Sequence, residues 1–175
     1  CQFADFPHLA AITEPQKYST HFGDAHPLMG ALTISPRRGC LGFYCSCIPN
    51  QSYDDHAVAW FLRQLLRHQR GKIHLVWDRS PIHRGPEVNA LLAAHPRLKI
   101  IELPAYAPEL NPVEFIWSYL KYSRLANLAL PDLKALQKYL EKELRLLHHN
   151  QVMLKQLCKG TELTGLDRMY FADGQ

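Results

Sequence analysis

The chain has 175 residues, of which 47% are hydrophobic and 21% charged, and its formal net charge is +4. This length and balance are typical of one globular domain with a substantial core, and they exclude a fibrous or low-complexity chain. No apolar run approaches the roughly 20 residues of a membrane-spanning helix, and no secretory signal precedes the first predicted strand. The mild positive charge permits nucleic-acid binding without requiring it.

The cysteines and histidines do not form a recognisable metal or disulfide pattern. The chain has five cysteines, an odd number, and no pair has the Cys-x-x-Cys spacing of a zinc site. Cys45 and Cys47 would share one face of a predicted strand, and we interpret them as small buried hydrophobes. The early histidines His8, His21 and His26 are scattered, so we interpret them as surface or loop residues and not as metal ligands. A reducing cytosol fits this composition.

Three strands are predicted in the first third of the chain. The segment Cys1–Asp5 is a short strand that ends in an acid, and residues 6–27 form a poorly patterned connection. Strands are predicted over 28–35 and 39–48, because the intervening Pro36-Arg37-Arg38-Gly39 is a hairpin signal. The arginines of this turn either contact phosphates or keep an exposed turn in solution.

A helix is predicted over 52–70. Ser52 and Asp55 form a capping-box-like start, and Gly71 ends the helix. The predicted buried face comprises Val58, Phe61, Leu62, Leu65 and Leu66. The basic residues at its far end suit a helix C-terminus without any ligand.

The next predicted strand, 73–78, is almost continuously apolar, as expected for a strand buried on both faces. It ends at Asp78, and open α/β sheets bind ligands beyond the carboxyl ends of their strands. A turn-initiating Asp before Pro81 is the plainer interpretation. A helix over 86–94 and a strand over 98–103 follow.

The stretch from Leu103 to Trp117 predicts a strand end, a proline-rich loop and a helix start. Asn111 is a favourable N-cap, and Pro112 then occupies the first helical position. Glu114 stands in the first turn, where a carboxylate serves either as a cap or as a functional group. The helical spacing predicts a buried stripe formed by Val113, Ile116, Trp117 and Leu120.

The last strong helix is predicted over 131–149. Its outer residues, Lys138, Glu141, Lys142, Glu143 and Arg145, mix charge signs, which is typical of a solvated face. A short helix is predicted around 151–158, and residues 160–175 are predicted to form a loose tail. Strands alternating with helices after an early set of strands indicate a mixed α/β domain over 1–159.

Two motifs resemble a known family. They are Trp77-Asp78-Arg79-Ser80-Pro81-Ile82-His83-Arg84 and the stretch from Leu103-Pro104-Ala105-Tyr106-Ala107-Pro108 to Asn111-Pro112-Val113-Glu114-Phe115-Ile116-Trp117, followed by Leu120-Lys121-Tyr122. Together with the spacing between the two acids, they resemble the DDE transposases, most closely the IS630 group of the IS630/Tc1/mariner superfamily. The resemblance implies an RNase H-like fold, in which an antiparallel meander of three strands joins parallel strands in one mixed sheet flanked by helices.

The resemblance also implies the site. Asp5, Asp78 and Glu114 would be the catalytic carboxylates and the metal ligands, although Phe6-Pro7 departs from the residues that usually follow the first acid. Asp24 is the fallback for the first acid. Secondary candidates for DNA contacts or for support of the site are His83, Arg84, Asn111, Lys121 and Arg124.

The implied reaction is metal-dependent DNA strand cleavage and strand transfer during transposition of an insertion sequence. Carboxylates alone suit Mg²⁺, with Mn²⁺ as a substitute, and two ions are expected. The implied partners are transposon-end and target DNA, with a homodimer as a further expectation and no membrane or small-molecule cofactor. The implied setting is a bacterial cytoplasm, near the nucleoid.

Three interpretations of the function remain open at this point. The chain is an active transposase domain, a plain RNase H-like nuclease, or a decayed or repurposed transposase that no longer cuts DNA. Helix-turn-helix segments that precede the catalytic domain in IS630-like transposases are absent from this sequence.

Overall fold

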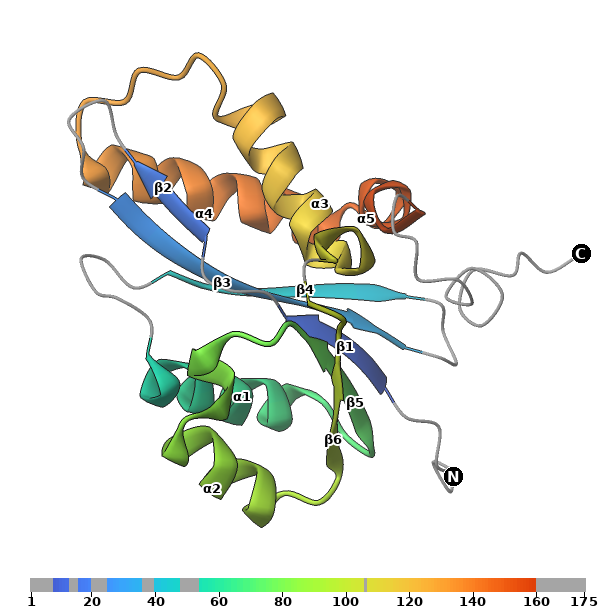
Figure 1. Cartoon of the computed structure of the whole chain (residues 1–175). Helices are drawn as coiled ribbons and strands as arrows, with labels where there is room; N and C mark the ends of the chain where they lie inside the picture. Colours follow the sequence, from blue (N-terminus) through green and yellow to red (C-terminus); the bar gives the residue numbers. More distant parts are fainter. Residues whose placement is uncertain are drawn as a thin grey trace, which may run out of the picture.

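A mixed six-stranded sheet with helices on both faces forms the centre of the domain (Figure 1). The computed structural model describes residues 8–12, 16–19, 25–35, 40–47, 54–105 and 107–159. The strands are β1 (His8–Ile12), β2 (Gln16–Ser19), β3 (Ala25–Ile34), β4 (Leu41–Cys47), β5 (Ile73–Trp77) and β6 (Leu98–Glu102). The helices are α1 (Asp55–His68), α2 (Pro86–Ala94), α3 (Pro112–Tyr119), α4 (Leu133–His149) and α5 (Gln151–Lys159).

Short helical turns complete the described chain. Two are 3₁₀ turns, η1 (Pro81–Arg84) and η2 (Pro108–Leu110), and both lie next to strand ends. The third, η3 (Leu120–Arg124), is a π turn that directly extends α3. None of the helices in the described residues combines the length and apolar character needed to cross a membrane.

The sheet joins an antiparallel half to a parallel half. β3 pairs antiparallel with β4 on one side, and with β1 and β2 in succession on the other. β1 then pairs parallel with β5, and β5 parallel with β6. The register places Ile12 of β1 opposite Trp77 of β5, and Trp77 opposite Glu102 of β6. The carboxyl ends of these three strands therefore meet at one edge of the sheet, next to Asp78.

The predicted mixed sheet is confirmed, but the described residues include two strands that were not predicted, β1 and β2. The segment 6–27, predicted as an irregular connection, contains β1, β2 and the start of β3. The expected strand Cys1–Asp5, the fallback Asp24 and the tail 160–175 lie outside the described residues. The cap of α1 is also different, because the Asp54 carboxylate accepts from the backbone N–H of Ala57 at 2.9 Å. Ser52 is outside the described residues.

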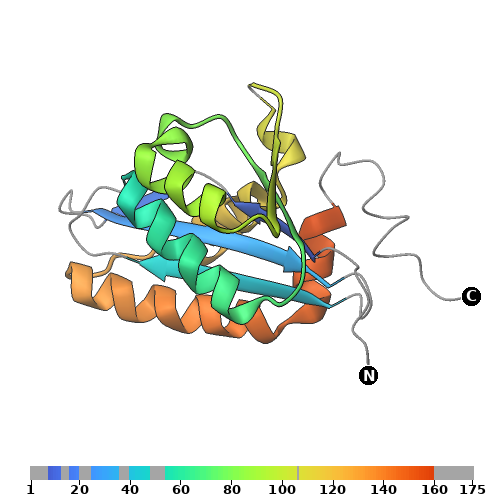
Figure 2. The ribbon, with the colours of Figure 1, turned by 90° about the horizontal axis from the view of Figure 1, so that it is seen from below.

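Two apolar layers, one on each face of the sheet, hold the domain together. α1 and α2 cover the face that carries Leu75 and Trp77, as Figure 2 shows from that side. α3, α4 and α5 cover the opposite face, which includes Val76. The strand β5 is thus buried on both faces, as its apolar sequence predicts.

α3 approaches the sheet closely at Gly30 of β3. A methyl group added at Gly30 would lie 2.6 Å from Cζ2 of Trp117, closer than atoms can pack. The same indole meets Phe43 of β4 edge-on, with ring centroids 5.8 Å apart. Because Trp117 is 3% exposed, this contact fixes the height of α3 above the sheet and hence the position of Glu114 one turn earlier.

Side chains from the end of α4 and the start of α5 bond to the backbone of β4. The amide of Gln151 donates from Nε2 to the Leu41 carbonyl at 2.7 Å and accepts from the Leu41 N–H at Oε1 at 2.9 Å. Nδ1 of His148 lies 2.8 Å from the carbonyl oxygen of Phe43. In the described residues β4 pairs with β3 alone, so these contacts lie on its outer side.

At the amino ends of β5 and β6, Arg97 ties the end of α1 to the sheet. Its guanidinium donates to the carbonyls of Gln69 at 2.8 Å, Gly71 at 2.9 Å and Leu66 at 2.5 Å. These are carbonyls at and just beyond the helix C-terminus, which the helix itself cannot satisfy. The positive charge also suits the negative end of the helix dipole.

Candidate active site

Asp78 follows β5 directly, at the edge of the sheet where the parallel strands end. One carboxylate oxygen, Oδ1, accepts from the backbone N–H of Ser80 at 3.1 Å. The same oxygen lies 3.0 Å from Nδ1 of His83. Two donors from the turn that follows therefore set the orientation of this carboxylate, while its side chain stays 35% exposed.

His83 lies beneath Asp78 in the protein interior. Its side chain is 1% exposed and stacks on the Trp77 indole, with centroids 4.4 Å apart and planes inclined by 7°. Nδ1 faces two acceptors, the Asp78 carboxylate and, at 3.2 Å, the Asp78 carbonyl, so Nδ1 carries a proton. Among the residues that the structure describes, Nε2 has no hydrogen-bond partner although it is buried. The ring therefore uses Nδ1 as its donor, toward Asp78.

Glu114 stands in the first turn of α3, as predicted. The Asn111 side chain caps the helix by accepting from the Val113 N–H at 3.2 Å, and Pro112 occupies the first helical position. The predicted stripe is also confirmed, because Val113, Ile116, Trp117 and Leu120 are all buried. Glu114 itself is half-buried beside this stripe, so its carboxylate is carried by a rigid helix start.

One open hollow of about 510 Å³ brings Asp78 and Glu114 together. The two acids come from elements that are distant in the sequence, the end of β5 and the start of α3. The rest of its lining comes from the turn after Asp78 and from the loop before α3: Arg79, Ser80, Pro81, Leu103, Pro104, Ala105, Ala107 and Asn111. The hollow thus combines two carboxylates with a largely apolar wall.

Glu102, the last residue of β6, pairs with two arginines, and one of them, Arg79, lines the hollow. Arg84 donates from Nη2 to both carboxylate oxygens of Glu102 at 3.0 Å, and Arg79 Nε lies 3.7 Å away from the same group. All three side chains are substantially exposed, and exposed pairs of this kind contribute only about 0.2–1 kcal/mol each. An incoming phosphate could therefore take either arginine at little cost.

The remaining sequence candidates do not line the hollow. Lys121 is exposed on η3, with its ammonium 5.3 Å from the ring centre of Tyr122. Arg124 is committed elsewhere, because its Nε donates to Oε2 of Glu143 at 2.6 Å. That bond, together with the charge of the guanidinium, holds the pKa of Glu143 below its ordinary value. This pairing favours a structural role for Arg124 over a DNA contact.

Sequence reasoning missed Ser80, Trp77 and Glu102 as parts of this site. The only sequence signal for Ser80 was its position two residues after Asp78, because an Asp side chain commonly accepts from the backbone N–H two residues further on. Glu102 ends the neighbouring parallel strand, which could have marked it as a rim residue. Within the described part of the chain, no three His, Cys, Asp or Glu residues are grouped as a complete metal site.

Comparison with known proteins is consistent with this geometry. A family model described as DDE superfamily endonuclease matches residues 29–137, more than half of the chain. The catalytic domain of the Mos1 mariner transposase is similar, with a TM-score of 0.62 and 13% identity over 86% of this chain and 78% of that chain. No curated protein is similar enough to match the sequence.

Two assemblies contain chains of similar structure. In the Mos1 transposase paired-end complex with the left transposon end, the match covers 86% of this chain and 51% of that chain, at 13% identity and a TM-score of 0.62. For a chain of a simian T-cell lymphotropic virus intasome, the match covers 91% of this chain and 57% of that chain, at 17% identity and a TM-score of 0.57. At such identities the likeness establishes the RNase H-like fold.

Proposed function

Because the chain belongs to the family of DDE superfamily endonucleases, with which residues 29–137 match, we propose that it cuts and joins DNA strands in the transposition of an IS630-type insertion sequence. The observation that carries the proposal is the convergence of Asp78 and Glu114 in one hollow at the carboxyl edge of the sheet. An apolar wall beside two carboxylates suits a substrate that has both sugar and phosphate surfaces.

The donor groups of the hollow fit a hard divalent cation. Carboxylate and amide oxygens are present, and the described residues that line the hollow include no His or Cys, which suits Mg²⁺ or Mn²⁺ rather than zinc. Asp78 and Glu114 would hold the metal, with a third carboxylate completing a site for two ions. Structures of the Mos1 catalytic domain with raltegravir are described with Mn and with Mg. A bound divalent ion supplies Lewis-acid stabilisation of the charge on a reacting phosphate.

The first cut is a hydrolysis. Water attacks the phosphorus, the bond to the 3′ oxygen breaks, and the products are a 3′-hydroxyl and a 5′-phosphate. In the joining step that 3′-hydroxyl attacks a target phosphodiester, and one ester bond replaces another without an external oxidant or reductant. Asp78 and Glu114 orient the reacting groups, and Arg79 or Arg84 binds a neighbouring phosphate after leaving Glu102.

His83 acts in this proposal as a positioning residue. Its Nδ1 donor holds the Asp78 carboxylate, and its stacking on Trp77 holds the imidazole. Partners of this type orient metal ligands and raise metal affinity without contacting the metal themselves. Asn111 has a comparable part for Glu114, because its side chain caps the turn that carries the acid.

The identity of the third carboxylate is open to a direct test. Asp5 is the residue implied by the family resemblance, and it lies outside the described residues. The register of β1 adds a second candidate, because Ile12 is opposite Trp77 and Glu14 follows Ile12 by two positions in the sequence. Mn²⁺ titration of Asp5→Asn and Glu14→Gln variants distinguishes them, since only the true ligand lowers the affinity.

The partners in this proposal are transposon ends and target DNA, with a homodimer bringing two ends together. The setting is a bacterial cytoplasm near the nucleoid, and no small-molecule cofactor is required. The paired-end and intasome assemblies of similar proteins support DNA as the partner class. A plain nuclease and a domain that has lost catalysis are separated from this function by the experiment below.

The test compares metal binding and DNA nicking in one set of variants. We expect wild type to bind Mn²⁺ and to nick a supercoiled plasmid, and Asp78→Asn and Glu114→Gln to lose both. Glu109→Gln is the matched control, because Glu109 is exposed on η2 and does not line the hollow. Preferential cutting of an RNA–DNA hybrid would instead identify a plain RNase H-like nuclease. Absence of both Mn²⁺ binding and nicking in wild type would identify a domain that has lost catalysis.

A further inference from the structure

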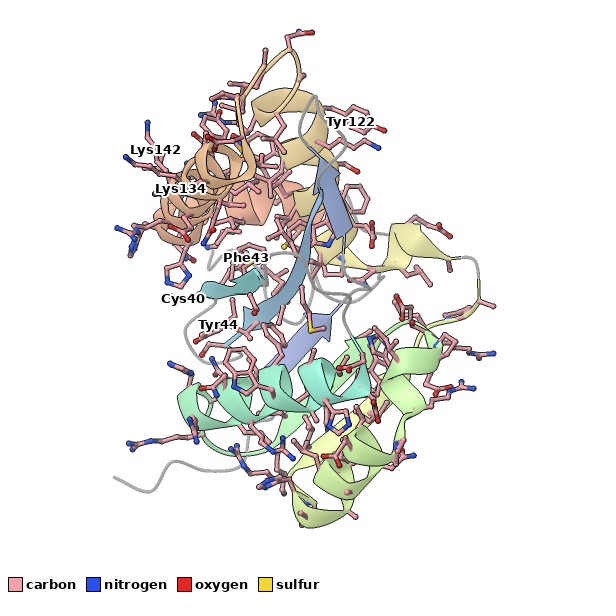
Figure 3. All side chains as sticks on the ribbon, turned by 90° about the vertical axis from the view of Figure 1, so that its left-hand side faces the viewer. Cys40, Phe43, Tyr44, Tyr122, Lys134 and Lys142 are labelled. Atoms are coloured by element: carbon pink, nitrogen blue, oxygen red, sulfur yellow. The ribbon has the colours of Figure 1, made fainter. Side chains whose placement is uncertain are left out.

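The exposed face of α4 carries a row of positive charges. Lys134, Lys138 and Lys142 recur every four residues, and Arg145 follows one turn later. Residues at this spacing lie on the same side of a helix. All four are exposed, and Figure 3 shows Lys134 and Lys142 pointing away from the body of the protein on the same side. We call these four residues the α4 cation row.

Positive and negative side chains that alternate in the sequence of α4 lie in different places in the structure. Glu143 lies between two members of the row in the chain, yet its side chain turns inward, is 7% exposed and binds Arg124. Glu141 stays outside, where it accepts a hydrogen bond from Gln137 at 2.9 Å. The solvated face of mixed sign predicted from the sequence is therefore a predominantly cationic face.

Among the residues that the structure describes, no member of the row forms an ion pair within 4.0 Å. The exposed Glu141 and the charge of Glu143, which interacts with Lys142, offset only part of the four positive charges. Like charges four residues apart also destabilise a helix. A bound polyanion would compensate these like charges, which repel one another in the isolated domain. At a rise of about 1.5 Å per residue, successive lysines are about 6 Å apart, close to the phosphate spacing along a DNA strand.

We propose that the α4 cation row binds the phosphate backbone of duplex DNA, independently of its base sequence. The inference rests on the proposed function for the identity of the polyanion. α4 packs on β4 and β3, at the side of the sheet away from β5 and β6 (Figure 2). The row therefore contacts a stretch of DNA other than the phosphate that lies between Asp78 and Glu114.

The test is the salt dependence of duplex binding by the whole chain. Wild type is compared with Lys134→Gln/Lys138→Gln/Lys142→Gln in a fluorescence anisotropy titration of a 30-base-pair duplex in EDTA, over a series of salt concentrations. Each phosphate contact contributes about 0.9 to the slope of log affinity against log salt. We expect the triple variant to lose about 2 to 3 from this slope, and its affinity at 0.1 M salt to fall by about tenfold or more.

A control triple variant removes the same charge elsewhere. Lys99, Lys155 and Lys159 are exposed on β6 and α5, and their replacement by Gln leaves the α4 cation row intact. Wild-type affinity and slope in this control, with wild-type melting temperatures in both variants, support the proposal. Equal loss in both triple variants would show an effect of net charge alone and overturn it, as would an unchanged slope in the α4 variant or no duplex binding by wild type.

Metal binding separates this inference from the proposed function. The α4 variant is expected to bind Mn²⁺ with wild-type affinity, because the row is remote from the hollow. If the α4 variant loses salt slope but wild type binds no Mn²⁺, the α4 cation row is supported as a DNA surface and the catalytic function is overturned. If wild type binds Mn²⁺ and nicks DNA but the α4 variant keeps the wild-type salt slope, the catalytic function is supported and the DNA surface is overturned.

Discussion

The two ends of the parallel strands use their polar groups in opposite ways. At the amino ends, Arg97 satisfies three carbonyls that the end of α1 leaves open, so the charge is used within the protein. At the carboxyl ends, Asp78 and Glu114 face a hollow, and Arg79, which also lines it, forms an exposed ion pair with Glu102. One end stabilises the fold and the other holds charged groups available for a ligand. Substitutions at the two ends should therefore have separable effects.

The largest expected effect is at the carboxyl end. Asp78→Asn should reduce DNA nicking by at least about 10³-fold, because it would remove a proposed ligand of an ion that supplies several kcal/mol of charge stabilisation. The free energy of unfolding should change little, since the side chain is partly exposed and the amide oxygen can still accept from Ser80. Nicking rates and urea denaturation check the two parts. Loss of stability equal to the loss of activity would contradict the contrast between the ends.

The next effect concerns His83, which belongs to the carboxyl end although it is buried. His83→Gln should weaken Mn²⁺ affinity by about 10- to 100-fold. His83→Asn should recover most of that affinity, because its amide nitrogen can occupy the place of Nδ1 and donate to Asp78. Calorimetric Mn²⁺ titration measures both variants. Equal affinities in the two variants would indicate that His83 only fills space.

A metal-free measurement tests the same hydrogen bond directly. A long-range ¹H–¹⁵N spectrum of the histidine rings should report hydrogen on Nδ1 of His83. A His83 ring with hydrogen on Nε2 alone would contradict the bond to Asp78, whatever the metal affinity.

At the amino end the expected effect is on stability alone. Arg97→Ala should lower the free energy of unfolding by about 2 kcal/mol, allowing for partial exposure, because carbonyls of the α1 terminus lose a charged donor. Arg97→Lys should recover little, since an ammonium cannot reproduce the fork of the guanidinium. Mn²⁺ affinity should stay at the wild-type value in both. A change in metal affinity would show that the two ends are coupled through β5 and β6.

The smallest effect concerns Arg124 and Glu143, a second arginine used within the protein. Glu143→Gln should cost about 1–2 kcal/mol at neutral pH. The folded-state pKa of Glu143 is lowered, so its contribution is present above the ordinary value of 4.5 and is lost as the pH falls through the lower folded value. The stability difference between wild type and variant should therefore narrow below pH 4.5. Thermal melts at several pH values test this, and a constant difference would contradict it.

The elements that the sequence predicts best carry their signals locally. Asn111, Pro112 and the stripe from Val113 to Leu120 specify the start and buried face of α3 within a few residues, and the apolar run of β5 specifies a strand covered on both faces. β1 was missed because its five residues are a strand only by virtue of β3 and β5 on either side. Partners distant in the sequence decide such elements, and propensity alone does not identify them.

The same limit applies to individual side chains. Arg124 was a candidate for a DNA contact or for support of the site, but it lies in the π turn η3, and its guanidinium meets Glu143 of α4. Asp54 and Ser52 are both good capping residues, and only the three-dimensional start of α1 selects Asp54. The support of Asp78 by His83 depends on the turn between them and on stacking with Trp77, neither of which the linear spacing specifies.

The side-chain amide of Gln151 supplies one donor and one acceptor to the backbone of Leu41 in β4, which are the two hydrogen bonds that a residue of a neighbouring strand would form. An exposed strand edge is a template for pairing with a second sheet, and Gln151 with His148 occupies that template at Leu41 and Phe43. Two copies of this protein could extend one continuous sheet across β4 only after the turn between α4 and α5 had moved away. The domain is thereby guarded against polymerisation at Leu41 and Phe43, and the homodimer proposed above would form through other surfaces.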